Sequence, residues 1–506
     1  MSEARLIRIH PNDNVAISVQ ALVAGSVVTF DGRRITLEQD VPAGHKVALA
    51  RIAAGQPVVK YGFAIGRALV DLQPGSWVHS DALQTQLTGQ LSYRFAASAP
   101  RPQSENSMPT FMGYRRRNGR VGTRNEIWII NTVGCVNHAA ERIARLAADR
   151  FAAQAGERFR GRIDGIHSFS HPYGCSQLGD DLHNTQAALA GMLRHPNAGG
   201  VLVLGLGCEN NQMSSLLAQA GDVDGDRLRF FNTQEVIDEV EEGLDAIESL
   251  VAVMESDERE ECPVSDLVLG MKCGGSDGFS GITANPLVGR IADRLTELGG
   301  AVLLTEVPEM FGAEQVLLER AADERVFNDI VAMINGFKEY FTQHNQPIYE
   351  NPSPGNKAGG LTTLEEKSLG AIQKGGQATV TDVLRYGQPV RAPGLALLES
   401  PGNDGVSSTA MVASGATMLL FTTGRGTPLG FPVPTVKISS NSEIAQRKPH
   451  WIDFNAGELL DGTADMTALS ERLFAFILDV ASGRALTNNE KHGYREIAIW
   501  KEGVTL

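Results

Sequence analysis

The sequence predicts a multidomain α/β protein with a small β-rich domain at its N-terminus. Its 506 residues correspond to about three domains at ~150 residues each. Short β-type runs separated by turn signals fill the first 95 residues. After a proline-rich segment, apolar strand-like runs alternate with amphipathic helices, which is typical of layered α/β folds.

The N-terminal domain is predicted to span residues 1–95. Its β-type runs are VAISV, SVVTF, RRITL, KVALA, QPVVKYG and SWVHS, with turn signals such as Asp31-Gly32 and Pro74-Gly75 between them. The next segment, residues 96–110, reads AASAPRPQSENSMPT and contains three prolines and several small polar residues without periodicity. That composition predicts a linker.

Two α/β domains are predicted after the linker, over residues 111–254 and 255–506, with the charge-rich ESDEREE at the boundary. EIWIINTV and GVLVLGLG are expected to form buried parallel strands. In the last domain DLVLG, a helix and AVLLTE form a predicted βαβ unit. Asn285 is the expected N-cap of that helix, with Pro286 at its first position.

Charge and cysteine content limit the function classes. There are 45 Lys and Arg against 59 Asp and Glu, which gives a net charge of −14 and argues against nucleic acid or an anionic membrane as partner. Five scattered cysteines do not make a disulfide framework and indicate a reducing compartment. With no signal peptide and no long apolar run, we expect a cytoplasmic protein that acts on a small molecule.

Four of the five cysteines follow apolar runs where the chain turns: Cys135, Cys175, Cys208 and Cys273. Because the carboxyl ends of parallel strands form the ligand crevice, neighbouring strands would bring these thiols into one pocket. Such a pocket suits iron, zinc or an iron–sulfur cluster, with Glu306 and Glu309 as alternative hard ligands. The alternative is that cysteine serves as a small apolar residue at tight strand ends. Cys262 lies in the acidic boundary segment and is given no role.

Four glycine-rich loops form the second chemical feature, CGGSDGFSGITANP, NPSPGNKAGGLTT, SPGNDGVSST and TTGRGTPLGFPVPTVK. Their backbone N–H groups, with donors that include Ser276, Asn356, Lys357 and Arg425, suit a polyhydroxylated carboxylate. None of the loops is a Walker A sequence or a properly placed GxGxxG, so a nucleotide is not indicated. Any single loop could equally be only a turn.

The N-terminal domain adds His45, Lys46 and His79. Histidine titrates near neutrality, so these residues are candidate general bases. The alternative is that both histidines are surface or hydrogen-bonded structural residues of a β domain.

Taken together, the motifs resemble the altronate/galactarate dehydratase family over essentially the whole chain. The resemblance is carried by PAGHKVALARI, VVKYG, YRRRNGRVGTRNEIWI, HPYGCSQLGDD, LGLGCENNQ, CGGSDGFSGITANP, TEVPEMFGAEQ, NPSPGNKAGGLTTLEEKS and TTGRGTP. It implies an N-terminal SAF-type β-clip domain, a middle α/β domain that makes dimer contacts, and a Rossmann-like C-terminal domain with a parallel sheet. HPYGCSQLGDD and NPSPGNKAGG favour the altronate branch of the family over the galactarate branch.

The implied activity is that of a hydro-lyase that converts D-altronate into 2-dehydro-3-deoxy-D-gluconate, as a homodimer that depends on Fe²⁺ or Mn²⁺. His45, Lys46 and His79 would then sit on a lid as bases, and Lys357, Arg425, Asn356 and Ser276 would bind substrate. Two other activities stay open, a galactarate dehydratase and a lyase with another leaving group, such as sulfite from sulfolactate. A sugar-acid-binding regulator would need a DNA-binding module, and the sequence offers none.

Overall fold

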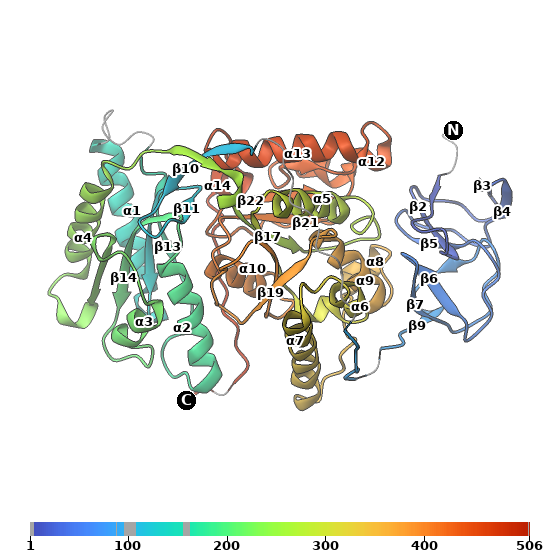
Figure 1. Cartoon of the computed structure of the whole chain (residues 1–506), viewed down its shortest axis with the longest axis horizontal. Coiled ribbons are helices and arrows are strands. Elements are labelled where there is room, and N and C mark those ends of the chain that lie inside the picture. The colour runs from blue at the N-terminus through green and yellow to red at the C-terminus, as the bar shows by residue number, and fades with distance from the viewer. Residues whose placement is uncertain (1–4, 88, 96–107, 155–161, 504) are drawn as a thin grey trace.

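The chain forms three bodies arranged in a row, seen in a computed structural model that describes residues 5–87, 89–95, 108–154, 162–503 and 505–506 (Figure 1). The small β domain lies at one end, the C-terminal domain in the middle and the second domain at the other end. Most of the predicted linker, residues 96–107, lies outside the described residues. No helix in the described ranges is long and apolar enough to cross a membrane.

The N-terminal domain consists of short antiparallel strands, and each β-type run of the sequence contains one of them. They are β1 (Leu6–Ile7), β2 (Val15–Ser18), β3 (Val27–Phe30), β4 (Arg33–Thr36), β5 (Lys46–Ala48), β6 (Pro57–Lys60), β7 (Phe63–Ala68), β8 (Trp77–Val78) and β9 (Leu83–Gln84). Two sheets, β1-β2-β5-β8 and β6-β7-β9, and the hairpin β3-β4 make up the domain. The strands are short because Gly-containing turns interrupt the apolar runs every few residues.

The second domain is a four-stranded parallel sheet in the order β13-β12-β14-β15. Its elements are β12 (Glu126–Asn131), α1 (Asn137–Gln154), β13 (Gly165–Phe169), α2 (Gly179–Leu193), β14 (Ala198–Gly205), α3 (Met213–Ala220), β15 (Leu228–Asn232) and α4 (Glu239–Met254). Residues of α1 and α4 pack on one face of the sheet, and residues of α2 pack on the other. Both central strands are buried and carry apolar runs, IWII in β12 and VLVL in β14, because both of their faces are covered.

The C-terminal domain is built on a seven-stranded parallel sheet in the order β19-β20-β18-β17-β21-β22-β23. The strands are β17 (Val268–Cys273), β18 (Ala301–Leu304), β19 (Val380–Leu384), β20 (Gly394–Leu398), β21 (Met418–Thr423), β22 (Thr435–Ser439) and β23 (Phe454–Asn455). Its helices are α5 (Ala284–Glu297), α6 (Glu314–Leu318), α7 (Glu324–Gln343), α8 (Pro354–Ala358), α9 (Leu364–Ala371), α10 (Asp404–Ala413), α11 (Ser442–Arg447), α12 (Glu458–Asp461), α13 (Met466–Ala481) and α14 (Asn488–His492). The predicted fold class, a β domain followed by α/β domains with a parallel sheet, is confirmed.

The predicted N-cap of α5 is wrong by two residues. The helix begins at Ala284, and Thr283 occupies the N-cap position in place of Asn285. The Asn285 side chain is engaged elsewhere, since it donates to the Gly370 carbonyl at 3.0 Å and accepts from Thr422 Oγ at 2.6 Å. A tertiary contact therefore overrides a local capping preference.

A small antiparallel sheet joins the second and C-terminal domains. It consists of β10 (Thr110–Arg115), β11 (Val121–Gly122) and β16 (Glu260–Pro263), and β10 pairs with both of the others. Thr110, the last residue of the predicted linker, begins a strand, and the end of the acidic boundary segment lies in another. Cys262 is fully buried there and is a packed core residue.

The second and C-terminal domains also share one hydrophobic core. Helix α2 packs on the second-domain sheet through Leu189 and Met192, while α10 packs on the C-terminal sheet through Met411, and the two helices contact each other. Buried residues of both sheets belong to the same core cluster. These two domains therefore form one continuous body.

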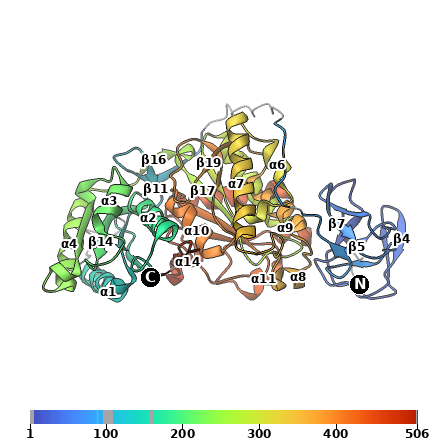
Figure 2. The same ribbon diagram turned by 90° about the horizontal axis from the view of Figure 1, so that it is seen from below.

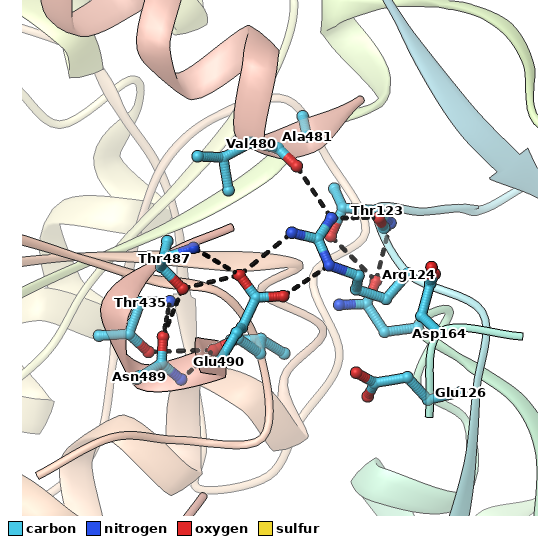
Figure 3. Close-up of polar contacts among 12 residues, drawn as sticks. Thr123, Arg124, Glu126, Asp164, Thr435, Val480, Ala481, Thr487, Asn489 and Glu490 are labelled. Carbon is cyan, nitrogen blue, oxygen red and sulfur yellow. Dashed lines mark hydrogen bonds and ion pairs between the residues drawn. The ribbon is translucent and has the colours of Figure 1, made fainter. Parts of the chain in front are cut away.

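A buried ion pair also connects the second and C-terminal domains (Figure 3). Arg124, two residues before β12, donates through Nε and Nη2 to the Glu490 carboxylate of α14 at 2.6 and 3.1 Å. Its Nη1 donates to the carbonyl oxygens of Thr123 and Val480 at 2.7 and 2.8 Å. Glu490 also accepts from the N-cap residue Thr487, so one carboxylate caps α14 and holds the neighbouring domain.

We expect Glu490→Gln to destabilise the protein by about 3–5 kcal/mol, because a buried guanidinium loses its contacting carboxylate. Gln keeps the shape needed for the cap, so the loss reports on charge. Urea unfolding followed by circular dichroism measures the change. Glu443→Gln, in an exposed pair with Arg447, is the control and should cost less than about 1 kcal/mol. Equal effects for the two variants would contradict the role given to the buried pair.

Candidate active site

The candidate site lies where the strand order of the C-terminal sheet switches direction. Strand β17 is flanked by β18 on one side and β21 on the other, so the chain builds outward from it both ways. In open parallel sheets the crevice at such a point, outside the carboxyl ends of the strands, is the usual ligand site. Cys273 is the last residue of β17, and Glu306 and Glu309 follow β18 directly.

Three lysines and three carboxylates converge at this edge. Lys272 of β17 pairs with Glu306 and with Asp404, the latter at 2.7 Å. Lys374, just after α9, lies 3.3 Å from Glu306. Lys367 of α9 lies 2.7 Å from Glu309. All but Asp404 are buried, so each charge is held by a partner and not by water.

The close pairing lowers the pKa of Glu309 and raises the pKa values of Lys367 and Lys374. Burial alone would raise the pKa of Glu309, but Lys367, Lys374 and Lys272 outweigh it and lower the pKa to about 2. Burial alone would lower the pKa of Lys374 and Lys367, yet the neighbouring acidic groups raise both. The lysines therefore stay protonated at neutral pH and supply fixed positive charge.

The Cys273 thiol completes the cluster. Its Sγ lies 2.7 Å from Lys374 Nζ and 3.4 Å from a Glu309 carboxylate oxygen. Burial raises the pKa of this thiol to about 12, and the two glutamates add to the shift. In the described part of the chain, Cys273, Glu306 and Glu309 are the one group of three metal-ligand side chains whose ligand atoms all lie within 4.8 Å of one another.

A cavity of about 480 Å³ opens beside these groups. Its volume is in the range of small-molecule sites. The polar side chains of its lining come from five separate segments: Cys273, Ser276, Glu309, Glu350, Asn351, Ser353, Asn356, Lys367, Asn403 and Asp404. Lys367 Nζ donates to the side-chain oxygens of Asn351 and Asn356 at 2.8 and 3.2 Å, which fixes its ammonium group at the cavity wall.

Local sequence explains how these groups approach so closely. A Cβ on Gly274 would lie 2.6 Å from both Asp404 Oδ2 and Phe421, so only glycine allows Asp404 to reach the end of β17. Glu306 adopts a left-handed conformation with φ of 70°, which is uncommon for a residue with a side chain. Such backbone strain is found at functional sites.

The predicted substrate-binding residues separate into two pairs. Ser276 and Asn356 line the cavity, and Asn356 Nδ2 donates to the Ser276 carbonyl at 2.8 Å. Lys357 and Arg425 are not among the lining residues. Arg425 is exposed, and its backbone N–H donates to the Gly275 carbonyl at 3.1 Å. Its guanidinium therefore lies near the cavity but outside its wall.

The N-terminal domain docks beside this cavity, against α8 and α9 (Figures 1 and 2). Lys46 and Lys60, both buried, donate to the Glu366 carboxylate of α9 at 2.8 and 2.7 Å. The backbones of the two domains approach closely at Gly44 and Gly278, since a Cβ on Gly278 would lie 1.9 Å from the Gly44 carbonyl oxygen. The two lysines lower the pKa of Glu366 to about 2, against the opposing effect of burial.

The three predicted bases lie at this docking surface and not in the cavity wall. Lys46 is committed to Glu366 and to the Gly360 carbonyl. Trp77 donates to His45 Nδ1 at 3.1 Å, so the proton sits on Nε2, which faces the Ala358 carbonyl at 3.3 Å. Burial lowers the pKa of His45 to about 4. His79 Nε2 lies 2.9 Å from the Lys357 carbonyl, next to cavity residue Asn356.

The four strand-end cysteines do not share one pocket, which corrects that expectation. Cys273 ends a strand of the C-terminal sheet, whereas Cys135, Cys175 and Cys208 follow β12, β13 and β14 of the second-domain sheet. The physical reason is that the chain builds two separate parallel sheets, each with its own carboxyl edge. Cys273 is buried and the other three are exposed.

Sequence reasoning missed the site's lysines, Lys272, Lys367 and Lys374, and its third carboxylate, Asp404. One signal was available, because Lys272 interrupts the buried apolar run VLGMKC. A lysine is almost never fully buried unless it is paired. Nothing local marks Lys367 or Lys374, whose partners come from segments 58 and 68 residues away, Glu309 for the first and Glu306 for the second.

The fold and site together define a class of three-domain α/β proteins in which a small β domain docks beside a buried lysine, carboxylate and thiol site. Three family models match the chain: an altronate/galactarate dehydratase SAF domain over residues 4–86, a D-galactarate dehydratase/altronate hydrolase second domain over 113–255, and a D-galactarate/altronate dehydratase C-terminal domain over 264–505. The chain therefore belongs to the altronate/galactarate dehydratase family.

Curated relatives are similar over their full lengths. The altronate dehydratase of Escherichia coli (strain K12) is 51% identical, and that of Bacillus subtilis (strain 168) is 48% identical, each over 99% of both chains. The galactarate dehydratase (L-threo-forming) of Escherichia coli (strain K12) is 35% identical over 98% of this chain and 96% of its own. The likeness is therefore stronger to the two altronate enzymes.

We expect Glu366→Gln to undock the N-terminal domain, because Lys46 and Lys60 would stay buried without a carboxylate. The carboxylate's lowered pKa contributes stability above about pH 4.5, and this stability is lost as the pH falls toward 2. At pH 7 the variant should therefore lose about 3 kcal/mol or more. Hydrogen exchange of β5 and β6 and urea unfolding at pH 7 measure it. The exposed Glu324→Gln is the control, and an unchanged exchange pattern in Glu366→Gln would refute the docking role.

Proposed function

We propose that this protein is a carbon–oxygen hydro-lyase that dehydrates D-altronate to 2-dehydro-3-deoxy-D-gluconate. Support comes from the family and from the stronger likeness to relatives named altronate dehydratase. The observation that carries the chemistry is the cavity at the switch point of the sheet, where the protonated Lys367 and the carboxylates of Glu309 and Asp404 line the wall and the buried lysines Lys272 and Lys374 pair with Glu306 behind it. A sugar acid offers the matching groups, one carboxylate and several hydroxyls.

Substrate would bind with its carboxylate against the Lys367 ammonium group. The side chains of Asn351, Asn356 and Ser276 and the backbone of the glycine-rich loop 274–276 then face its hydroxyl groups. A planar amide both donates and accepts, so asparagines suit hydroxyl groups that do the same. Arg425, outside the wall, would attract the anion toward the cavity entrance.

The reaction needs a base for the proton on C2, stabilisation of the resulting ene-diolate, and a proton for the leaving C3 hydroxyl. Of the three predicted bases we assign the first role to His79. Its Nε2–H faces a carbonyl, so the lone pair is on Nδ1, whereas both nitrogens of His45 are engaged and Lys46 is paired. His45 and Lys46 are positioning residues that hold the domain in place.

Negative charge grows on the carboxylate side of the substrate as the C2 proton leaves. Lys272 and Lys374 lie behind the cavity wall and would stabilise this charge by electrostatic attraction, because both are buried, protonated and held in place by Glu306. The imidazolium formed on His79 can return its proton to the departing C3 hydroxyl, which leaves as water. The enol that remains takes up a proton at C3 and becomes the 2-keto acid.

A divalent ion, Fe²⁺ or Mn²⁺, fits the donor set Cys273, Glu306 and Glu309. Their ligand atoms converge, and thiolate with carboxylates suits a borderline metal. Three lysines balance three carboxylates, so a divalent charge would be offset by loss of the thiol proton and by the substrate carboxylate. When bound, such an ion supplies Lewis-acid polarisation of substrate oxygens.

The proposed activity is tested by supplying the reduced protein, with Fe²⁺, with D-altronate, galactarate and sulfolactate in parallel. We expect 2-keto-3-deoxy acid from altronate, with kcat/KM well above that for the other two. Lys367→Met should reduce kcat/KM on altronate at least 100-fold, because the buried charge that meets the carboxylate is gone. The exposed Lys491→Met is the matched control. Sulfite release from sulfolactate as the main reaction would refute the proposal.

The base assignment predicts a clear difference between two histidine variants. His79→Asn should lower kcat by about 10²–10⁴-fold and abolish exchange of the C2 proton with D₂O. His45→Gln should keep that exchange, because its side chain acts only on domain position. NMR of altronate in D₂O measures the exchange. Full activity in His79→Asn would show that another residue takes the proton.

A further inference from the structure

Three exposed cysteines gather at one edge of the second domain, away from the proposed dehydration site. Cys135 follows β12, Cys175 follows β13 and Cys208 follows β14. These three strands are direct neighbours in the order β13-β12-β14, and all run parallel. Neighbouring strands lie about 4.8 Å apart, so their carboxyl ends place the three following loops side by side.

Backbone hydrogen bonds lock these loops together. Gly134 N–H, next to Cys135, donates to the Tyr173 carbonyl at 2.8 Å. On the other side of Cys175, Ser176 N–H donates to the Asn210 side-chain oxygen at 2.7 Å. The Gly174 carbonyl in turn accepts from Asn211 N–H at 2.9 Å. The Cys175 loop is therefore fastened to the Cys135 loop through one residue pair and to the Cys208 loop through two.

The remaining backbone of this edge is equally constrained. Glu209, the residue after Cys208, is buried and accepts from the N–H groups of Leu206 and Gly207 at 3.1 and 2.6 Å. Ser176 adopts a left-handed conformation with φ of 57°. The loops that carry the thiols are thus preorganised, although the thiols themselves are exposed.

Two buried amides at the same edge are incompletely satisfied. The side-chain oxygens of Asn131, the last residue of β12, and Asn211, near Cys208, accept no hydrogen bond within the described ranges. Both side chains are fully buried. An unmade hydrogen bond at a buried amide is costly, so both oxygens are open to a further group bound at this edge.

The three thiols are not gathered tightly enough to surround a single metal ion. The three sulfur atoms do not all lie within 4.8 Å of one another, unlike the ligand atoms of Cys273, Glu306 and Glu309. Thiolates on a single tetrahedral zinc, at ~2.3 Å from the metal, would be about 3.8 Å apart. A cluster of several metal atoms spans a wider triangle of thiolates, and Fe–S clusters are held by cysteine thiolates.

From these observations we infer that Cys135, Cys175 and Cys208 hold a [4Fe–4S] cluster, with one iron left without a protein thiolate. Each thiol gives up its proton on ligation, and the exposed edge leaves the fourth iron open to a further ligand. This site is separate from the Cys273 cluster, so the chain has two metal-binding regions of different chemistry. The inference does not depend on the identity of the sugar acid.

The test is to isolate the full-length protein without oxygen and to measure iron, acid-labile sulfide and the visible absorption of the cluster. We expect about four iron and four sulfide per chain, beyond any single divalent ion. Cys135→Ser, Cys175→Ser and Cys208→Ser should each lose most of the sulfide. Cys262→Ser, a cysteine outside the three loops, is the matched control and should retain it.

Three further measurements separate loss of the cluster from misfolding and from failure of the proposed dehydratase activity. Circular dichroism checks that each variant is folded. Lys367→Met should keep the full iron and sulfide content while losing activity, so failure of the dehydratase proposal and failure of the cluster proposal give different results. In the loaded protein, iodoacetamide should leave the three thiols unmodified, and they should react once a chelator removes the iron. Wild-type protein without sulfide, or a triple serine variant that retains it, would overturn the inference.

Discussion

Charge compensation inside the C-terminal domain is the constraint on which the rest of the structure depends. Lys272, Lys367 and Lys374 are removed from water, and each remains charged only because Glu306, Glu309 or Asp404 lies against it. The lysines come from β17 and from α9 and its extension, and the carboxylates come from the turn after β18 and from α10. The same buried pairs that fix Lys367 at the cavity wall therefore hold the carboxyl ends of the sheet together.

Helix α9 transmits this arrangement to the N-terminal domain through consecutive residues. Glu365 accepts from Thr85 and Gln86, and Glu366 accepts from Lys46 and Lys60, all in the N-terminal domain or its continuation. The next residue, Lys367, turns to Glu309 and the cavity. Docking of the β domain and the position of the cavity ammonium are thus set by one turn of helix. A displacement of the N-terminal domain would therefore move Lys367 as well, and a displacement of Lys367 would disturb the docked domain.

The cysteines show how strongly environment decides chemistry. Cys273 is enclosed among charged groups with a pKa raised to about 12, so it can act as a ligand only when a metal displaces its proton. The three second-domain thiols stand on rigid, exposed loops around an open edge. In the sequence all four share the same local context, an apolar run followed by a turn.

Local sequence patterns by themselves predicted the N-terminal β domain and the buried parallel strands that alternate with helices after it. They could do so because strand runs, turns and apolar periodicity are short-range signals. They also placed Ser276, Asn356, Glu306, Glu309 and Cys273 among the site candidates, since strand-end loops are where ligands bind. Only the tertiary structure separated the cysteines between two sheets, assigned Lys46 to docking and left Lys357 and Arg425 outside the cavity wall. Buried pairs such as Lys374 with Glu306 join segments far apart in sequence, so their meeting is decided by strand order and not by any local pattern.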